Sequence, residues 1–162
     1  MNLREHEGRD GYKVWLSSGE LDQLIETAPS ASAAIAFALA GRCGLRSQEV
    51  ADVTPKDIKR TDAGPIVRVV GKGDKYREAW LPEDLMTQIK TAAAFRDEPD
   101  HFPIVQSQGD SIKVSTRTLR RWIADAAAEL VTETDDDAWA QLSFHDLRRS
   151  WATNLAAAGV DP

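Results

Sequence analysis

The 162 residues are 42% hydrophobic and 28% charged, a balance typical of one soluble globular domain that builds its own core. No apolar run approaches the ~18 residues of a membrane span, and the chain opens without the apolar stretch of a signal peptide. A single cysteine, Cys43, excludes an internal disulfide and a cysteine-rich zinc site, so we expect a cytoplasmic protein with no membrane partner.

Charge limits how such a chain can meet nucleic acid. The formal net charge is −6 and the pI is about 5.1, which argues against a protein that coats DNA by bulk electrostatics. Asp outnumbers Glu by 16 to 10 and Arg outnumbers Lys by 13 to 7, a halophilic-type bias typical of proteins from salt-rich cytoplasm. The Debye length shrinks to ~3 Å at ~1 M salt. Any DNA binding must then depend on local clusters of cations.

The amino-terminal stretch differs in composition from the rest of the chain. Residues 1–16 are polar and charged and are interpreted as an arm or linker, whereas residues 17–162 are expected to form the domain. A helix is predicted to start at Ser17 to Glu20, because apolar residues succeed them at helical spacing. Pro29 stops it.

Two more helices are predicted before the pattern changes. Ala31 to Arg42 are nearly all small and apolar, which indicates a buried helix that ends at Gly44. Cys43 is best interpreted as a small core residue of this region. Ser47 is expected to cap a short helix that runs through Asp52.

The middle of the chain changes to a β pattern. Ile66 to Val70 and Tyr76 to Leu81 are β-rich and flank a glycine-containing turn, which predicts a hairpin. Pro82 opens another helix, to about Phe95. A loop rich in Asp, Pro and Gly comes next, and Phe102 to Gln106 are expected to form a third short strand.

The last third returns to helix. Thr116 to Val131 carry an apolar face at helical spacing, and Thr132 to Asp137 are expected to be an acidic loop. His145 to Ala158 predict the last helix. The fold class is therefore mainly α (α+β), a helical domain with one small antiparallel sheet.

Four cationic residues lie at or near predicted turns and helix starts. Arg46 lies at a tight corner between two predicted helices, and Lys72 lies in the hairpin turn between two glycines. His145 and Arg148 are three apart and share a helix face. Taken singly, each is interpreted more simply as a solvated surface residue or a local partner.

Taken in order, they match the motifs of one family. Gly44 to Glu49 match a "GLR-x-x-E" corner, Gly71 to Arg77 match a "GKG-x-K-x-R" turn with Pro82 after it, and His145 to Gly159 match "H-x-L-R-x-x-x-A-T-x-L-x-x-x-G". In these motifs the chain resembles the tyrosine recombinases, or phage integrases, over residues 17–162. The resemblance implies the helical catalytic domain of that family.

The resemblance also implies roles in DNA strand cleavage. Arg46 and Arg148 would clamp the non-bridging phosphate oxygens, for which planar guanidinium forks are suited. Preorganised groups of this kind contribute ~2.7–4 kcal/mol each to the transition state. Lys72 would protonate the departing 5′-hydroxyl, and His145 would support the phosphate and assist proton transfer. Glu49 would orient Arg46.

Further cations are plausible contacts to the DNA backbone, although a solvated surface is as good an interpretation of each. They are Lys75, Arg77, Arg117, Arg120, Arg121 and Arg149. The chemistry requires no metal and no cofactor. Asp135 to Asp137 are interpreted as a loop rather than a metal site.

The family's nucleophilic tyrosine has no counterpart in this sequence. It is expected well beyond Arg148, whereas the chain ends at Pro162 and its tyrosines are Tyr12 and Tyr76. Neither matches the position of the nucleophile. The chain is therefore expected to be truncated: deliberately shortened, shortened in its gene, or supplied with a tyrosine by another subunit. Apolar surface exposed by the missing segment would favour self-association, in a synaptic tetramer for the longer parent.

Three functions remain open from the sequence. The first is a segment of a site-specific recombinase that acts on double-stranded DNA at the nucleoid and is inactive alone. The second is a non-catalytic DNA-binding accessory or regulator derived from an integrase. The third is a helical protein-interaction domain without a DNA role, which the acidity suggests. The four cations at the catalytic positions favour the first.

Overall fold

The computed structural model describes residues 1–5, 11–107 and 112–160. In chain order the elements are β1 (Asn2–Glu5), β2 (Tyr12–Trp15), α1 (Ser18–Glu26), α2 (Ala31–Cys43), α3 (Ser47–Asp52), the 3-10 turn η1 (Pro55–Asp57), β3 (Ile58–Thr61), β4 (Gly64–Val70), η2 (Lys72–Asp74), β5 (Tyr76–Trp80), α4 (Glu83–Arg96), α5 (Thr116–Thr134), η3 (Asp137–Gln141) and α6 (Phe144–Ala157). The mainly helical fold with a small antiparallel sheet is confirmed.

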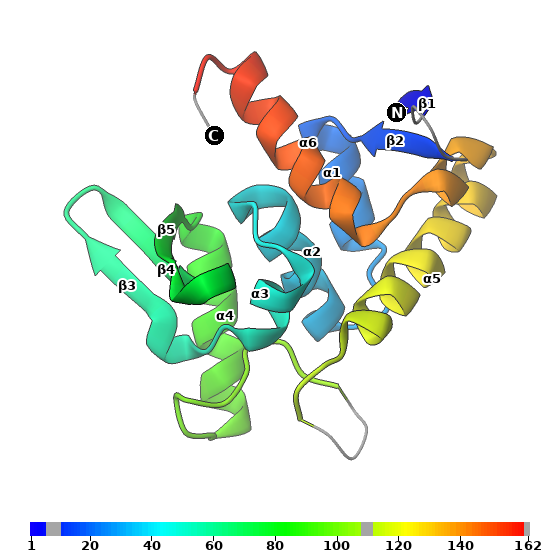
Figure 1. Cartoon of the computed structure of the whole chain (residues 1–162). Helices are drawn as coiled ribbons and strands as arrows, with labels where there is room; N and C mark the ends of the chain where they lie inside the picture. The colour runs from blue at the N-terminus through cyan, green and yellow to red at the C-terminus, as the bar shows by residue number, and fades with distance from the viewer. Residues whose placement is uncertain (6–10, 108–111, 161–162) are drawn as a thin grey trace.

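Helix α2 forms the centre of the molecule. It contacts α1, α3, α4, α5 and α6, and Figure 1 shows the three-stranded sheet with α4 on one side of it and α5 on the other. Nine of the thirteen residues of α2 are buried, including Cys43, as its composition predicted. The Ser30 hydroxyl accepts a hydrogen bond from the Ala33 N–H at 3.1 Å at its start. Gly44, with φ of 74°, ends it.

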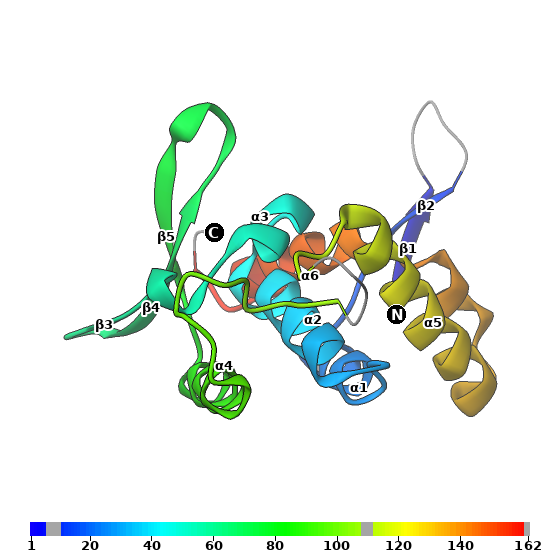
Figure 2. The ribbon, with the colours of Figure 1, turned by 90° about the horizontal axis from the view of Figure 1, so that it is seen from below.

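The predicted hairpin is present and belongs to a three-stranded antiparallel sheet in the order β3-β4-β5. Val67 pairs with Ala79 and both face the core, whereas Arg68 pairs with Glu78 on the exposed face. Figure 2 shows the turn between β4 and β5 projecting away from the helices. The hairpin thus carries its turn residues out to the surface.

The third strand of this sheet is β3, so the prediction of a strand at Phe102–Gln106 is wrong. Within the described residues the latter segment makes only an isolated bridge. Its Ile104 and Val105 are both buried, so its hydrophobicity reflects packing rather than strand pairing.

The described residues of the expected arm are ordered against the helices. Strands β1 and β2 pair antiparallel, and Val14 and Leu16 are completely buried. Strand β2 contacts α6, and the two lie side by side in Figure 1. Val14 and Leu16 are two residues apart, the spacing of side chains on one face of a strand, and the charges earlier in the segment concealed this signal.

Two helix boundaries differ from the sequence expectations. Helix α5 continues to Thr134, so half of the expected acidic loop is helical, and Asp135 ends the helix in a left-handed conformation. The loop after it includes η3, whose Trp139 is buried. Ser47 is the first residue of α3 rather than its cap, because Arg46 occupies the N-cap position. The remaining predicted helices are confirmed to within one or two residues.

Candidate functional site

The corner between α2 and α3 holds Arg46 beside a buried acid. Glu49 is the third residue of α3 and is only 5% exposed, and its Oε1 accepts a hydrogen bond from the backbone N–H of Arg46 at 2.8 Å. This bond caps the helix and fixes the backbone from which the Arg46 side chain extends. That side chain is 57% exposed, so its guanidinium faces outward.

Glu49 binds Arg77 more closely than it binds the Arg46 side chain. Arg77, on β5, forms an ion pair with Oε2 and donates a hydrogen bond to Oε1 at 2.9 Å. Arg46 Nη1 lies 3.8 Å from Oε2. Burial raises the pKa of Glu49, but the hydrogen bonds from Arg77 and from the Arg46 backbone outweigh it and leave the pKa lowered. The ionised Glu49 carboxylate therefore binds both the α2–α3 corner and the hairpin.

Arg77 also donates a hydrogen bond to the carbonyl of Gly44, at 3.3 Å. Its guanidinium thus joins β5 to the end of α2. These contacts give Arg77 a structural partner that sequence reasoning missed, and its predicted contact to DNA stays a prediction.

The hairpin turn brings Lys72 to the same place as Arg46. A surface hollow of about 600 Å³ is lined by Arg46, Gly71, Lys72, Lys75, Tyr76 and Arg77. Gly73, with φ of 75°, and the hydrogen bond from the Gly71 N–H to the Lys75 carbonyl at 2.7 Å shape the turn. Lys72 and Lys75 are exposed, so their ammonium groups are accessible to a ligand in this hollow.

Helix α6 contributes the remaining predicted site residues. Arg148 lines a neighbouring hollow of about 660 Å³, which Arg77 also lines. Burial lowers the pKa of Arg148, and the charges of Arg46 and Arg77 lower it further. The three arginines therefore lie close enough to repel one another, an arrangement that favours an anion between them. Within the described residues, the guanidinium of Arg148 makes no hydrogen bond or ion pair.

His145 lies one turn before Arg148 on the same helix. Partial burial, and then the charge of Arg149, lower the pKa of His145, while Asp146 opposes the shift. Arg148 and Arg46 lower it further. The imidazole is therefore mainly neutral near neutral pH and is able both to donate and to accept a proton.

An aromatic contact joins the two halves of the site. Gly44 lies directly against the ring of Trp151 on α6, so closely that a β-carbon at position 44 would collide with the indole. Gly44 also has a positive φ, which favours glycine on its own account. The corner that carries Arg46 and the helix that carries Arg148 are thus in direct contact.

The remaining predicted cations divide into two groups. Arg117, Arg120 and Arg121 are exposed on α5, which contacts α3, and no contact within the described residues joins them to the arginine cluster. Arg149 forms an ion pair with Asp146, which is only 2% exposed. Their contacts to DNA stay predictions.

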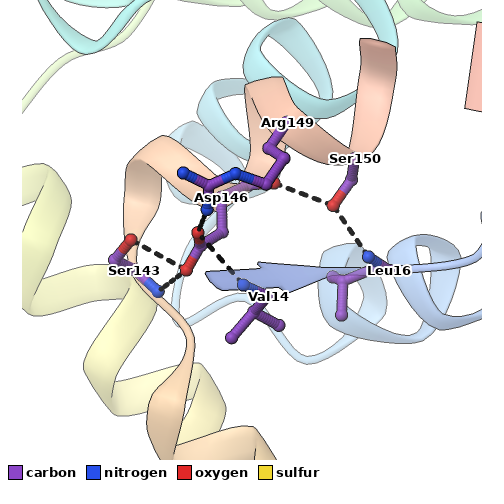
Figure 3. Close-up of polar contacts among 6 residues, drawn as sticks. All are labelled: Val14, Leu16, Ser143, Asp146, Arg149 and Ser150. Atoms are coloured by element: carbon purple, nitrogen blue, oxygen red, sulfur yellow. Dashed lines mark hydrogen bonds and ion pairs between the residues drawn. The ribbon is translucent and has the colours of Figure 1, made fainter. Parts of the chain in front are cut away.

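Sequence reasoning also missed a set of polar residues on α6. Asp146, Ser150 and Asn154 all bind the backbone at the end of β2, and Figure 3 shows the first two with their partners. Their spacing of four residues was the available signal, but an ordinary solvated helix face has the same spacing.

Both tyrosines are partly exposed. Tyr76 is 48% exposed beside Lys72, and the Arg68 guanidinium lies 4.7 Å from its ring centroid. Tyr12 lies on β2 and is 39% exposed. Among the described residues there is no group of three metal-ligating side chains, and none of the described helices has the length and apolarity to cross a membrane.

The sequence profile of the Phage integrase family matches residues 14–162. The chain belongs to the phage integrase family. The resemblance inferred from the three motifs is therefore confirmed. Tyrosine recombinase XerA of Pyrococcus furiosus is 29% identical over 150 residues, which cover 90% of this chain and 49% of that protein. XerA of Thermococcus onnurineus is 31% identical over 126 residues, covering 77% and 42%. The chain thus spans about half the length of these integrase-family relatives.

Solved structures of the integrase family share the fold. The crystal structure of XerA recombinase matches with a TM-score of 0.70 and 21% identity, over 96% of this chain and 53% of that one. XerH recombinase bound to its difH substrate matches with a TM-score of 0.69 and 20% identity, over 89% and 43%. At these identities the similarity extends to the architecture of the integrase catalytic domain.

Proposed function

We propose that this chain is part of the catalytic domain of a site-specific DNA recombinase, in which Arg46 and Arg148 bind the phosphate that is cleaved. The observation that carries the proposal is that Arg46 and Arg77 both pair with Glu49, while Arg77 lines the hollow of Arg46 and Lys72 as well as the neighbouring hollow of Arg148. Glu49 neutralises one arginine and leaves excess positive charge. A phosphodiester placed there would meet two guanidinium forks.

Lys72 is proposed as the general acid. It stands on an exposed turn, and an ammonium group there can reach the 5′-oxygen of a phosphate bound by Arg46. His145, mainly neutral at physiological pH, hydrogen-bonds the phosphate and shares in proton transfer. The family names of the XerA relatives support this reaction.

The phosphate clamp is tested by DNA binding. Arg46→Ala and Arg148→Ala are each expected to weaken binding of a fluorescent duplex about 10- to 100-fold, because each removes charged hydrogen bonds. Each should also reduce the slope of log K against log salt by about one unit. Arg60→Ala is the control, since Arg60 is paired with Glu83 on the exposed surface. Equal affinities for all four proteins, or no binding at any salt concentration, would contradict the clamp.

The role of Lys72 is tested by trapping strand cleavage. A nicked suicide duplex is incubated with the chain extended by its genomic downstream sequence, and the covalent adduct is measured. Lys72→Ala should slow adduct formation about 10²- to 10⁴-fold. Replacing the 5′-bridging oxygen by sulfur should restore the rate, because a thiolate leaves without protonation. Equal slowing on both substrates would exclude a general-acid role.

The partners and location are inferred from this reaction. We infer double-stranded DNA as the substrate, at the nucleoid of the cytoplasm. We also infer self-association on DNA through the apolar side chains of the hollow of about 660 Å³ beside α6, which Arg148 lines as well. Trp80 and Val160 in that hollow are 64% and 51% exposed. The acidic composition suits binding in high salt, through the arginine cluster rather than a long-range field. Light scattering with and without duplex tests the association.

A further inference from the structure

A polar stripe on α6 holds the backbone of β2 and of Leu16, the next residue. Asp146, Ser150 and Asn154 recur every four residues and so lie on one side of the helix. The Leu16 N–H donates to Ser150 Oγ at 2.8 Å, and Asn154 Nδ2 donates to the Leu16 carbonyl at 3.2 Å. Both backbone groups of Leu16 are therefore satisfied by α6, and its side chain is completely buried.

Asp146 is saturated with donors. One carboxylate oxygen accepts from the Ser143 N–H and hydroxyl, each at 2.9 Å. The other accepts from the Val14 N–H at 3.5 Å and from Arg149 (Figure 3). The two bonds from Ser143 cap the start of α6. The bond from Val14 joins the first turn of α6 to β2, and the contact with Arg149 joins it to the next turn of the helix. Because Asp146 is buried, each of these bonds is costly to leave unmade.

Ser150 carries the same connection one turn further along. Its hydroxyl donates to the Asp146 carbonyl at 2.8 Å while it accepts from Leu16. It is completely buried. Ser150 thus links the helix backbone at Asp146 directly to the β2 segment.

These contacts surround the residues that face the phosphate. His145 lies between Asp146 and Phe144, and the Phe144 ring packs against Phe37 of α2 with centroids 6.4 Å apart. Arg148 lies between Asp146 and Ser150 in sequence. The backbone on both sides of each functional residue is therefore fixed, while the two side chains remain accessible.

We propose that Asp146 and Ser150 are positioning residues, which place His145 and Arg148 against the phosphate by holding α6 on the backbone of residues 14–16. The proposal rests on the proposed function, because it assigns a means of orienting that same site. Docking of β2 and binding of phosphate are then thermodynamically coupled, and loosening one weakens the other.

Three variants separate positioning from a general loss of stability. Ser150→Ala removes the bond to Leu16 without changing any charge. Asp146→Asn keeps the size of the side chain but removes its charge. Thr134→Ala is the matched control, because Thr134 also donates its hydroxyl to a carbonyl four residues earlier, that of Leu130 in α5, at 2.6 Å. All are compared with the unaltered chain at a temperature where thermal unfolding shows each to be folded.

Two quantities are measured for each protein. The first is the dissociation constant for a duplex of about 30 base pairs, the length of a typical protein-binding site on DNA. The second is the pKa of His145, from its ring proton signals by NMR without DNA, with His101 as the internal reference. The charged groups around His145 are Arg148, Arg149 and Asp146 on its own helix and Arg46 from the corner. Ser150→Ala alters none of them, so a changed pKa would report a changed position.

Positioning predicts that Ser150→Ala and Asp146→Asn weaken DNA binding about fivefold or more, the usual range of coupling between sites. Ser150→Ala should also shift the His145 titration, and Thr134→Ala should do neither. Unchanged affinity and an unchanged His145 titration in Ser150→Ala would overturn the proposal, whatever its melting temperature. If the unaltered chain binds no DNA, the proposed function fails, and the His145 titration still decides whether Ser150 positions the helix.

Discussion

The starts of α3 and α6 use the same device. Each carries a buried acid as its third residue, Glu49 or Asp146, whose carboxylate accepts the backbone N–H of the N-cap residue. Each acid also pairs with an arginine, Arg77 or Arg149. A predicted phosphate ligand is close to each acid in sequence, Arg46 before Glu49 and Arg148 after Asp146, and in each case the acid makes its shortest ion pair with another arginine. A buried carboxylate can thus fix a cationic site by binding a different cation.

The difference lies in where the arginine comes from. Arg77 lies 28 residues from Glu49 and belongs to the hairpin, so that ion pair is itself the tertiary contact. Arg149 is one turn from Asp146 on the same helix, and the tertiary contact goes to the Val14 backbone instead. The α3 site therefore depends on its arginine more than the α6 site does. Three predictions test this comparison.

The largest effect is expected for Glu49→Ala. It removes both acceptors from Arg77 and the cap of α3, and should lower the free energy of unfolding by about 2–3 kcal/mol. The loss stays below that of a fully buried pair because Arg77 reaches solvent. Urea denaturation measures it. Glu83→Ala, which breaks a two-bond pair with Arg60 on the exposed surface, is the control and should cause no measurable change.

A smaller effect separates the two arginines. Arg77→Lys should cost about 1–2 kcal/mol of stability, because lysine cannot bind both Glu49 oxygens and the Gly44 carbonyl together. Arg149→Lys should cost under about 1 kcal/mol, since Asp146 keeps its bonds from Ser143 and Val14. Equal losses in the two variants would show that the two arginines are equivalent.

The smallest effect is a change of pH dependence. The folded pKa of Glu49 is lowered, so its ionised form contributes stability above the unfolded value of about 4.3, and that contribution is lost as pH falls through the folded pKa. The difference in unfolding free energy between the parent and Glu49→Gln should therefore narrow with acidification below about pH 4. A difference in unfolding free energy that stays constant or widens would contradict stabilisation by the ionised Glu49 carboxylate. Urea unfolding across this range provides the measurement.

The helices and the hairpin were predictable because their signals are local. Apolar spacing and the glycines at the turn determine them, and Gly44 marks the end of α2 in both sequence and structure. Strand β3 escaped prediction because its edge position leaves its two central residues, Lys59 and Arg60, exposed. Its sequence therefore lacks the apolar alternation of a strand.

The site was predictable in its members but not in its connections. The motifs identified Arg46, Lys72 and Arg148, and the structure brings them to adjoining hollows. The pairing of Glu49 with Arg77 depends on how the hairpin folds back, which no local pattern encodes. The role of Ser150 was equally hidden, because a serine on a helix gives no sign that a strand backbone will lie against it.

Contact between Gly44 and Trp151 has a consequence for how the sequence can change. The corner that carries Arg46 and the helix that carries Arg148 meet where the indole of Trp151 lies against the bare backbone of Gly44. A chain that acquired a side chain at position 44 would have to give up the indole at position 151, and the reverse exchange would leave a void. The two positions are therefore expected to evolve as a pair.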